Sequence, residues 1–230
     1  MDGPKLELFG YSLDFYFTVA SAYYLAYYYE ELTFVLTMFL PLAVILIMLK
    51  TYFLRGSETV MDTPEWIKKL TDKEVEISPE NDRIRMEYDY FEDTIRITQD
   101  SLEALTEEEV AALVKHEEGH SKIEKYIFST EILLMLIYPF ACYLSLIYFP
   151  LSAFSVAIPL LIFKFNSNLI TYVSEAYADL YSIRNGYREP LESAMDLDNV
   201  KKKIGLVIFL VNGYPCQGQR KIWFDIFTSD

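Results

Sequence analysis

The chain contains only two histidines, and they stand four residues apart in the run His116-Glu117-Glu118-Gly119-His120. On an α-helix this spacing places both imidazoles on one face about one turn apart, where they can bind the same metal ion. Glu117 lies beside them and can take a proton from a water molecule. A glutamate directly after the first histidine is the helix pattern of zinc metalloproteases, in which it acts as general base. The alternative is a chance match with two solvated surface histidines.

Two histidines do not complete a catalytic zinc site, which usually has three protein ligands. Because the chain has no third histidine, the third ligand must be a carboxylate or a thiol. Glu175 and Asp179, four residues apart directly after an apolar block, are the best candidates. We predict that Glu175 binds one zinc ion with the histidines, and that Asp179 orients a histidine through its other N–H. The alternative is that both are solvated helix acids.

The composition combines 52% hydrophobic residues with a net charge of -14 in 230 residues. These features coexist because the apolar residues and the charges occupy separate blocks. The acidic balance argues against nucleic acid as a partner, since nothing here neutralises phosphates. Two cysteines are too few for a disulfide framework or a cysteine-based zinc site.

Four apolar blocks approach or exceed the ~20 residues that span a bilayer, and they pair into two helical hairpins. The blocks cover about 11–29, 33–54, 127–149 and 151–170. For the first block a cleaved signal peptide is the alternative, although the chain start is not basic. For the last two blocks the alternative is a pair of core helices in a soluble protein. We therefore predict the lipid bilayer as a partner.

The flanking charges set the predicted orientation. Lys50 and Arg55 follow the second block, whereas the first hairpin tip carries only Glu30 and Glu31. Positive residues stay cytoplasmic, so the polar regions are expected in the cytosol, where they can form one domain. The predicted segments are a transmembrane hairpin at 1–54, a cytosolic part at 55–126, a second hairpin at 127–170 and a cytosolic part at 171–230.

Alternating polar and apolar residues predict a small sheet before the histidine helix. The strands are expected at 74–77, 83–88 and 94–98, and Thr106 to Glu109 form a capping-box pattern that opens the helix. The predicted fold class is a mostly α membrane protein with four transmembrane helices and a cytosolic α+β zincin-like domain. We expect the exposed sheet edge within 83–98.

Two charged residues fall inside the predicted second hairpin. Glu131 follows His120 by eleven residues, and Lys164 precedes Glu175 by eleven, about three helical turns. Such residues usually face a cavity or a partner in a membrane. We hypothesise that they face each other beneath the metal. The alternative is that both lie near the interface and snorkel.

The run from Thr98 to His120, followed after a hairpin by Glu175-Ala-Tyr-Ala-Asp179, is similar to the M48 family of membrane zinc metalloproteases. That family includes the heat-shock protease HtpX and the CAAX prenyl proteases. The four-span layout resembles the HtpX branch. The resemblance implies a zinc endopeptidase with His116, His120 and Glu175 as ligands and Glu117 as catalytic base.

The family commonly has a His-Pro pair near its C-terminus, with an arginine six residues after the histidine. This chain keeps Pro215 and Arg220 but has Tyr214 in the place of the histidine. The resemblance implies that Arg220 lies behind the metal ligands. A tyrosine hydroxyl can donate to a developing oxyanion, so Tyr214 is a candidate catalytic residue, the alternative being an ordinary turn tyrosine.

The function expected from these arguments is an integral, multi-pass cell-membrane protease. It would cleave membrane or membrane-associated proteins or peptides at the cytoplasmic face, and the family resemblance implies a role in membrane protein quality control. One alternative is a membrane sensor or adaptor whose zinc site is catalytically silent. A narrower alternative is a CAAX prenyl-type protease. The sequence leaves the oligomeric state open.

Overall fold

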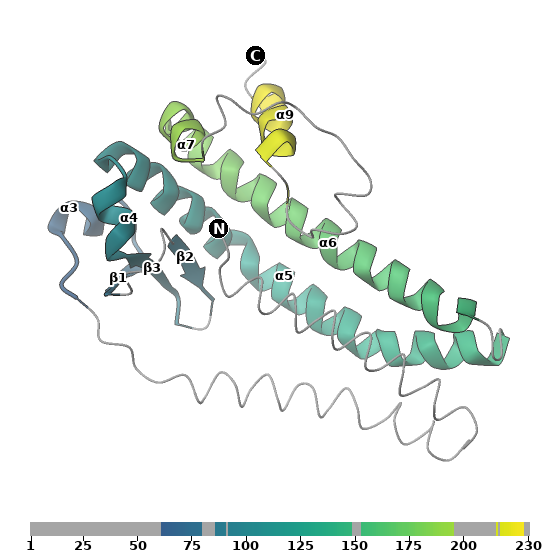
Figure 1. Cartoon of the computed structure of the whole chain (residues 1–230). Coiled ribbons are helices and arrows are strands. Elements are labelled where there is room, and N and C mark those ends of the chain that lie inside the picture. Colours follow the sequence, from purple (N-terminus) through teal and green to yellow (C-terminus); the bar gives the residue numbers. More distant parts are fainter. Residues whose placement is uncertain are drawn as a thin grey trace. The chain divides into compact units, whose positions relative to one another are not determined.

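The computed structural model describes residues 61–79, 86–90, 92–148, 153–195, 215 and 217–227 (Figure 1). The predicted N-terminal hairpin and Tyr214 lie outside the described residues. The chain divides into two compact units: Glu58–Ile127 with Asn168–Asp230 form the first, and Asp2–Ser57 with Phe128–Ser167 form the second. Helices α5 (Glu107–Tyr148) and α6 (Ala153–Arg184) contribute residues to both units.

The described sheet has three strands in the order β1-β3-β2. They are β1 (Glu74–Ser78), β2 (Met86–Asp89) and β3 (Thr94–Thr98). β1 pairs parallel with β3, and β2 pairs antiparallel with it. The predictions for the first and third strands are confirmed, and β2 lies inside the range predicted for the second. The exposed edge was predicted within 83–98. In that range β2 lies at one edge of the sheet, whereas β3 is the central strand.

Hydrophobic side chains of the sheet pack against the first turns of α5. They are buried because every second residue of β1 and β3 is β-branched and faces one side, where a helix covers it. The buried cluster consists of Ile67, Val75, Tyr88, Ile95, Ile97, Val110 and Val114. Ile67 comes from the short helix α3 (Glu65–Lys68), and helix α4 (Gln99–Ala104) leads from β3 towards α5.

The other side of α5 packs against the C-terminal helices. α7 (Arg188–Ala194) and α9 (Gln217–Phe227) are both short, and each buries a large apolar residue. This second cluster consists of Ala112, Leu113, Leu191, Met195 and Phe224. The start of α5 is therefore buried on two sides, which fixes the histidine run that follows.

The capping box predicted for the histidine helix is confirmed. The Thr106 backbone N–H donates to Glu109 Oε2 at 2.9 Å, and the Glu109 N–H donates to Thr106 Oγ1 at 3.3 Å. These bonds satisfy two backbone donors that have no partner inside the helix. The other oxygen of Glu109 accepts a bond from Ser193 Oγ of α7 at 2.6 Å, so the same glutamate also links two helices.

α5 continues without interruption from the histidines into the third apolar block. Nothing between His120 and Tyr138 terminates a helix, because that stretch has neither glycine nor proline. Within the described residues, one helical stretch, Glu107–Ser145, is long and apolar enough to cross a membrane. The four-span layout stays a prediction.

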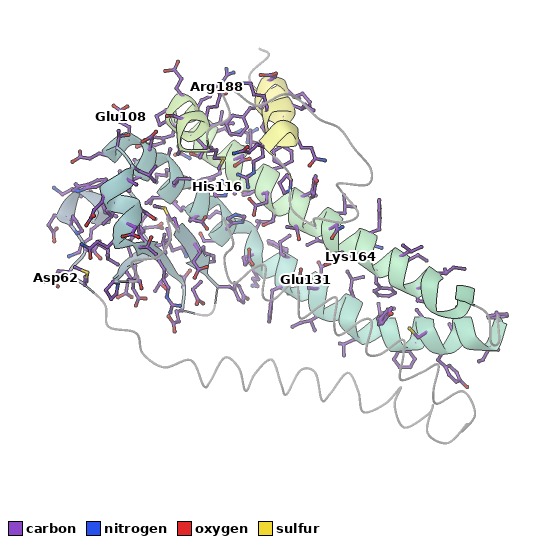
Figure 2. All side chains as sticks on the ribbon, in the orientation of Figure 1. Asp62, Glu108, His116, Glu131, Lys164 and Arg188 are labelled. Carbon is purple, nitrogen blue, oxygen red and sulfur yellow. The ribbon has the colours of Figure 1, made fainter. Side chains whose placement is uncertain are left out.

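The second unit contains the end of α5 and the beginning of α6. Tyr138 and Phe163 are buried and meet edge to face, with ring centroids 4.8 Å apart. Other apolar side chains of this unit are exposed: Leu133, Ile137, Phe140, Leu144, Ile147, Leu161, Ile162 and Phe165. Figure 2 labels Glu131 on α5 and Lys164 on α6. Their pairing stays a prediction.

Candidate metal centre

Helix α5 places His116 and His120 one turn apart, as the spacing predicts. Both side chains are buried, with only 4% and 1% of their surfaces exposed. The ring centroids lie 4.9 Å apart and the ring planes are nearly perpendicular, at 84°. Neither histidine is a solvated surface residue, so the alternative of a chance surface match is wrong.

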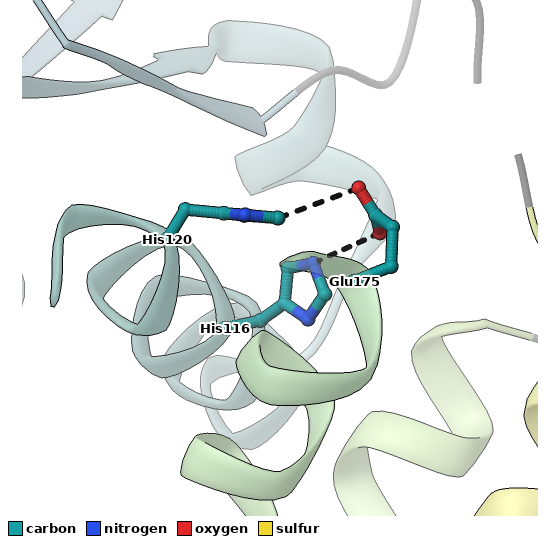
Figure 3. A group of neighbouring side chains, drawn as sticks. All are labelled: His116, His120 and Glu175. Atoms are coloured by element: carbon teal, nitrogen blue, oxygen red, sulfur yellow. Dashed lines mark ion pairs between the residues drawn. The ribbon is translucent and has the colours of Figure 1, made fainter. Parts of the chain in front are cut away.

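The Glu175 carboxylate of α6 faces both imidazoles, with one oxygen directed at each ring (Figure 3). Its Oε2 is 3.6 Å from His116 Nε2, and its Oε1 is 3.5 Å from His120 Nε2. One ligand atom from each residue lies within 4.8 Å of the others. Tetrahedral zinc with bonds of about 2.1 Å holds its ligand atoms about 3.4 Å apart, so this set of two nitrogens and one carboxylate fits the ion.

A glycine lets the two helices come close enough to form this group. A Cβ on Gly119 would lie 2.8 Å from Ala178 Cα and 3.0 Å from Tyr181 Cβ, both on α6. Only a residue without a side chain fits there. The role of Gly119 was not predicted from the sequence, although glycine inside a helix costs about 1 kcal/mol relative to alanine and is a known sign of close packing.

Asp179 lies behind His116 and is fully buried. Its Oδ1 is 2.8 Å from His116 Nδ1, as expected for a carboxylate that orients an imidazole. Burial opposes protonation of His116. The carboxylates of Asp179 and Glu175 outweigh it and raise the pKa of His116 to about 9 in the metal-free protein.

Helix α9 adds two donors behind the carboxylates. Arg220 donates to Glu175 Oε2, and to Asp179 Oδ1 at 3.3 Å. Trp223 Nε1 donates to Asp179 Oδ2 at 3.0 Å. Arg220 thus contacts both carboxylates, and its role in supporting a metal ligand stays a prediction. Trp223 was missed, because nothing in the local sequence connects it with a residue 44 positions earlier.

His120 has a different kind of partner. Its Nδ1 lies 2.9 Å from Ser174 Oγ, and both side chains are buried. The hydroxyl can accept from Nδ1, which leaves Nε2 to face the Glu175 carboxylate. The role of Ser174 was not predicted, although its position directly before the third candidate ligand was a usable signal.

The two glutamates of the histidine run have different surroundings. Glu117 Oε2 accepts a 2.8 Å bond from the backbone N–H of Tyr88, on the edge strand β2. Glu118 instead forms a partly buried ion pair with Lys115 at 2.7 Å and accepts from the Tyr181 hydroxyl at 2.7 Å. Although burial opposes ionisation, these partners hold the pKa of Glu118 below its usual value. Glu118 therefore links α5 to α6.

Comparisons with known proteins give one informative likeness. No family model matches the chain, and no curated protein does. Among solved structures, the chain is similar to Ste24p of S. mikatae, with a TM-score of 0.56 and 15% sequence identity. The match covers 94% of this chain but 63% of the Ste24p chain. At this identity the likeness shows a shared fold.

Proposed function

We propose that the chain is a membrane zinc endopeptidase of the M48 type. The observation that carries the proposal is the buried group of His116, His120 and Glu175, with Glu117 directly after the first histidine. Among the described residues this group has no fourth protein ligand, so a metal ion bound there would keep one open position. An open position distinguishes catalytic zinc sites from structural ones. The fold shared with Ste24p supports the same proposal.

A zinc ion held by these three residues supplies Lewis-acid chemistry: it lowers the pKa of water and polarises a carbonyl group. Glu117 takes the proton from the attacking water and returns it to the leaving amine. Asp179 holds the His116 ring in one orientation, and Arg220 bonds to the carboxylates of both Glu175 and Asp179. Hydrogen bonding of the oxyanion by Tyr214 remains part of the proposal.

The proposed substrates are membrane or membrane-associated proteins cut at the cytoplasmic face, in membrane protein quality control. Membrane substrates are supported by α5, because the helix that carries the histidines continues into an apolar stretch long enough to cross a membrane. The motif resemblance gave the HtpX branch as the first choice. The likeness to Ste24p does not favour that branch, and it is compatible with the CAAX prenyl-type alternative; this chain spans less than two thirds of that protein.

The test uses the full chain purified in detergent with zinc supplied. Zinc content is measured by mass spectrometry, and cleavage is followed on an unfolded membrane-protein reporter and on a prenylated CAAX peptide. Glu117→Gln should keep zinc but lose activity about 10²- to 10⁴-fold, because only the general base is removed. Glu118→Gln is the matched control one residue away, and it should keep both zinc and most of the activity.

The outcomes separate the alternatives. Cleavage of the reporter alone supports the quality-control proposal, whereas cleavage of the prenylated peptide alone supports the CAAX-type alternative. Zinc binding without cleavage of either substrate, in wild type as in Glu117→Gln, would establish the silent sensor or adaptor. Absence of bound zinc would end both zinc-based proposals.

A further inference from the structure

Strand β2, at one edge of the sheet, is hydrogen-bonded directly to Glu117. The Tyr88 backbone N–H donates to Glu117 Oε2 at 2.8 Å, and this contact is buried. Tyr88 pairs with Ile95 across the β2–β3 ladder, but its N–H is directed at α5. A main-chain group of β2 thus meets the carboxylate that our proposed function assigns as general base.

The side chain of Tyr88 is also hydrogen-bonded, through its hydroxyl group. Its hydroxyl donates to Asp93 Oδ1 at 2.6 Å, and Lys73 forms an ion pair with the same oxygen. Burial and the bond to Asp93 raise the pKa of Tyr88, so the hydroxyl stays protonated and remains a donor. Tyr88 itself is 8% exposed. The residue is therefore anchored through both its backbone and its side chain.

Asp93 stands in the turn between β2 and β3 with a φ of 56°, in the left-handed region that side chains rarely adopt. Aspartate tolerates this conformation better than most residues. The contacts of its carboxylate with Lys73 and Tyr88 hold it there. The bond from the Tyr88 hydroxyl therefore ties β2 to Asp93, the residue directly before β3.

We propose that Tyr88 is a positioning residue for Glu117. Its backbone N–H holds Oε2 and so sets the direction in which Oε1 points, while the Asp93 carboxylate anchors the strand that carries this N–H. The inference rests on the proposed function for its catalytic meaning, but the contact itself is testable without catalysis. A misplacement of about 1 Å in a catalytic group can cost about 100-fold in rate, so such an anchor matters.

The first experiment measures amide hydrogen exchange by NMR in the full chain in detergent micelles. Glu117→Ala removes the acceptor, so exchange of the Tyr88 amide should become about tenfold faster, since a hydrogen bond to a charged group is lost. Glu117→Gln keeps an oxygen acceptor and should preserve most of the protection. The Ile97 amide in the central strand is the internal control. Unchanged exchange of the Tyr88 amide in Glu117→Ala would overturn the inference.

The second experiment removes the donor. Tyr88→Pro and Tyr88→Ala both delete the ring, but only proline deletes the N–H, and an edge strand tolerates proline where the N–H faces away from the ladder. With zinc content unchanged, Tyr88→Pro should have a kcat about tenfold below that of Tyr88→Ala at similar KM, because the base loses a charge-assisted hydrogen bond. Equal kcat values in these two variants would refute the positioning role.

A variant that does not fold leaves the exchange experiment to decide, since that experiment alters only Glu117. The two proposals also fail separately. If wild type cleaves no substrate but the Tyr88 amide responds to Glu117→Ala, the proposed function fails and the positioning contact stands. If cleavage depends on Glu117 but that amide does not respond, the positioning inference fails alone.

Discussion

Replacement of Gly119 by alanine tests whether close helix packing builds the metal centre. The new Cβ would lie 2.8 Å from Ala178 Cα and 3.0 Å from Tyr181 Cβ, whereas ordinary contacts begin at 3.4 Å. The nearest neighbour is main chain, so no side-chain rotation relieves the clash. α6 must move away from α5 by roughly 0.6 Å or more, since core contacts of this kind leave no spare space.

The shift has a direct effect on the ligand set. Glu175 stands three residues before Ala178 on the same helix, so its carboxylate moves with the backbone that Gly119 contacts. Metal–ligand distances tolerate only about 0.2 Å. We expect Gly119→Ala to weaken zinc binding about 10- to 100-fold, the range seen when the support of a metal ligand is disturbed. A competitive titration against a chromophoric chelator measures this affinity.

Stability gives an independent readout of the same substitution. Alanine favours the helix by about 1 kcal/mol over glycine, whereas overpacking costs about 1–3 kcal/mol, so the metal-free protein should be unchanged or destabilised by up to about 2 kcal/mol. Gly186→Ala is the matched control. It has φ +91° but meets nothing within 4 Å, so it should lower stability without changing zinc affinity. Wild-type zinc affinity with a raised Tm in Gly119→Ala would refute the packing argument.

Two further predictions concern the partners of His116. Asp179→Asn keeps the shape of the side chain but removes the charge next to His116 Nδ1. We therefore expect the zinc affinity, measured by equilibrium dialysis, to fall about 10- to 100-fold. An unchanged affinity would show that this carboxylate does not support the ligand. The second prediction is a pH dependence of the metal-free protein. Its His116 has a pKa raised from 6.5 to about 9, so the folded state binds this proton more tightly than the unfolded chain. The resulting stabilisation is complete below the unfolded pKa and is lost as pH rises through about 9. Over the same window the apparent zinc affinity should rise, because a proton no longer competes for the ring. Thermal unfolding and zinc titration between about pH 6 and 9.5 measure both effects, and a zinc affinity that does not change across this window would contradict the assigned pKa.

Local sequence signals predicted the elements that carry the site. The Thr106–Glu109 capping box located the start of α5, because both of its hydrogen bonds join residues three apart. Alternation located β1 and β3, because every second side chain of these strands faces the same core. Glu175 was selected for a chemical reason, as a third ligand was required and the chain has no third histidine.

The unpredicted contacts join segments that no local pattern connects. Trp223 bonds to Asp179 from 44 residues away, and Ser174 approaches His120 from 54 residues away. Tyr88 reaches Glu117 through its backbone N–H, a group that every residue except proline carries, so residue type gives no signal. Such contacts are specified by the packing of whole helices and strands.

Gly119 shows how a local sequence feature depends on a long-range contact. Its position inside the histidine run is visible in the sequence, but its purpose depends on a neighbour 59 positions later on α6. Helix propensity alone disfavours glycine there by about 1 kcal/mol. The penalty is offset only if the close approach to Ala178 is needed, and the ligand geometry gives the reason: Glu175 contacts both imidazoles only when the two helices nearly touch. A local cost within a predicted helix thus marks the long-range contact on which the metal centre depends.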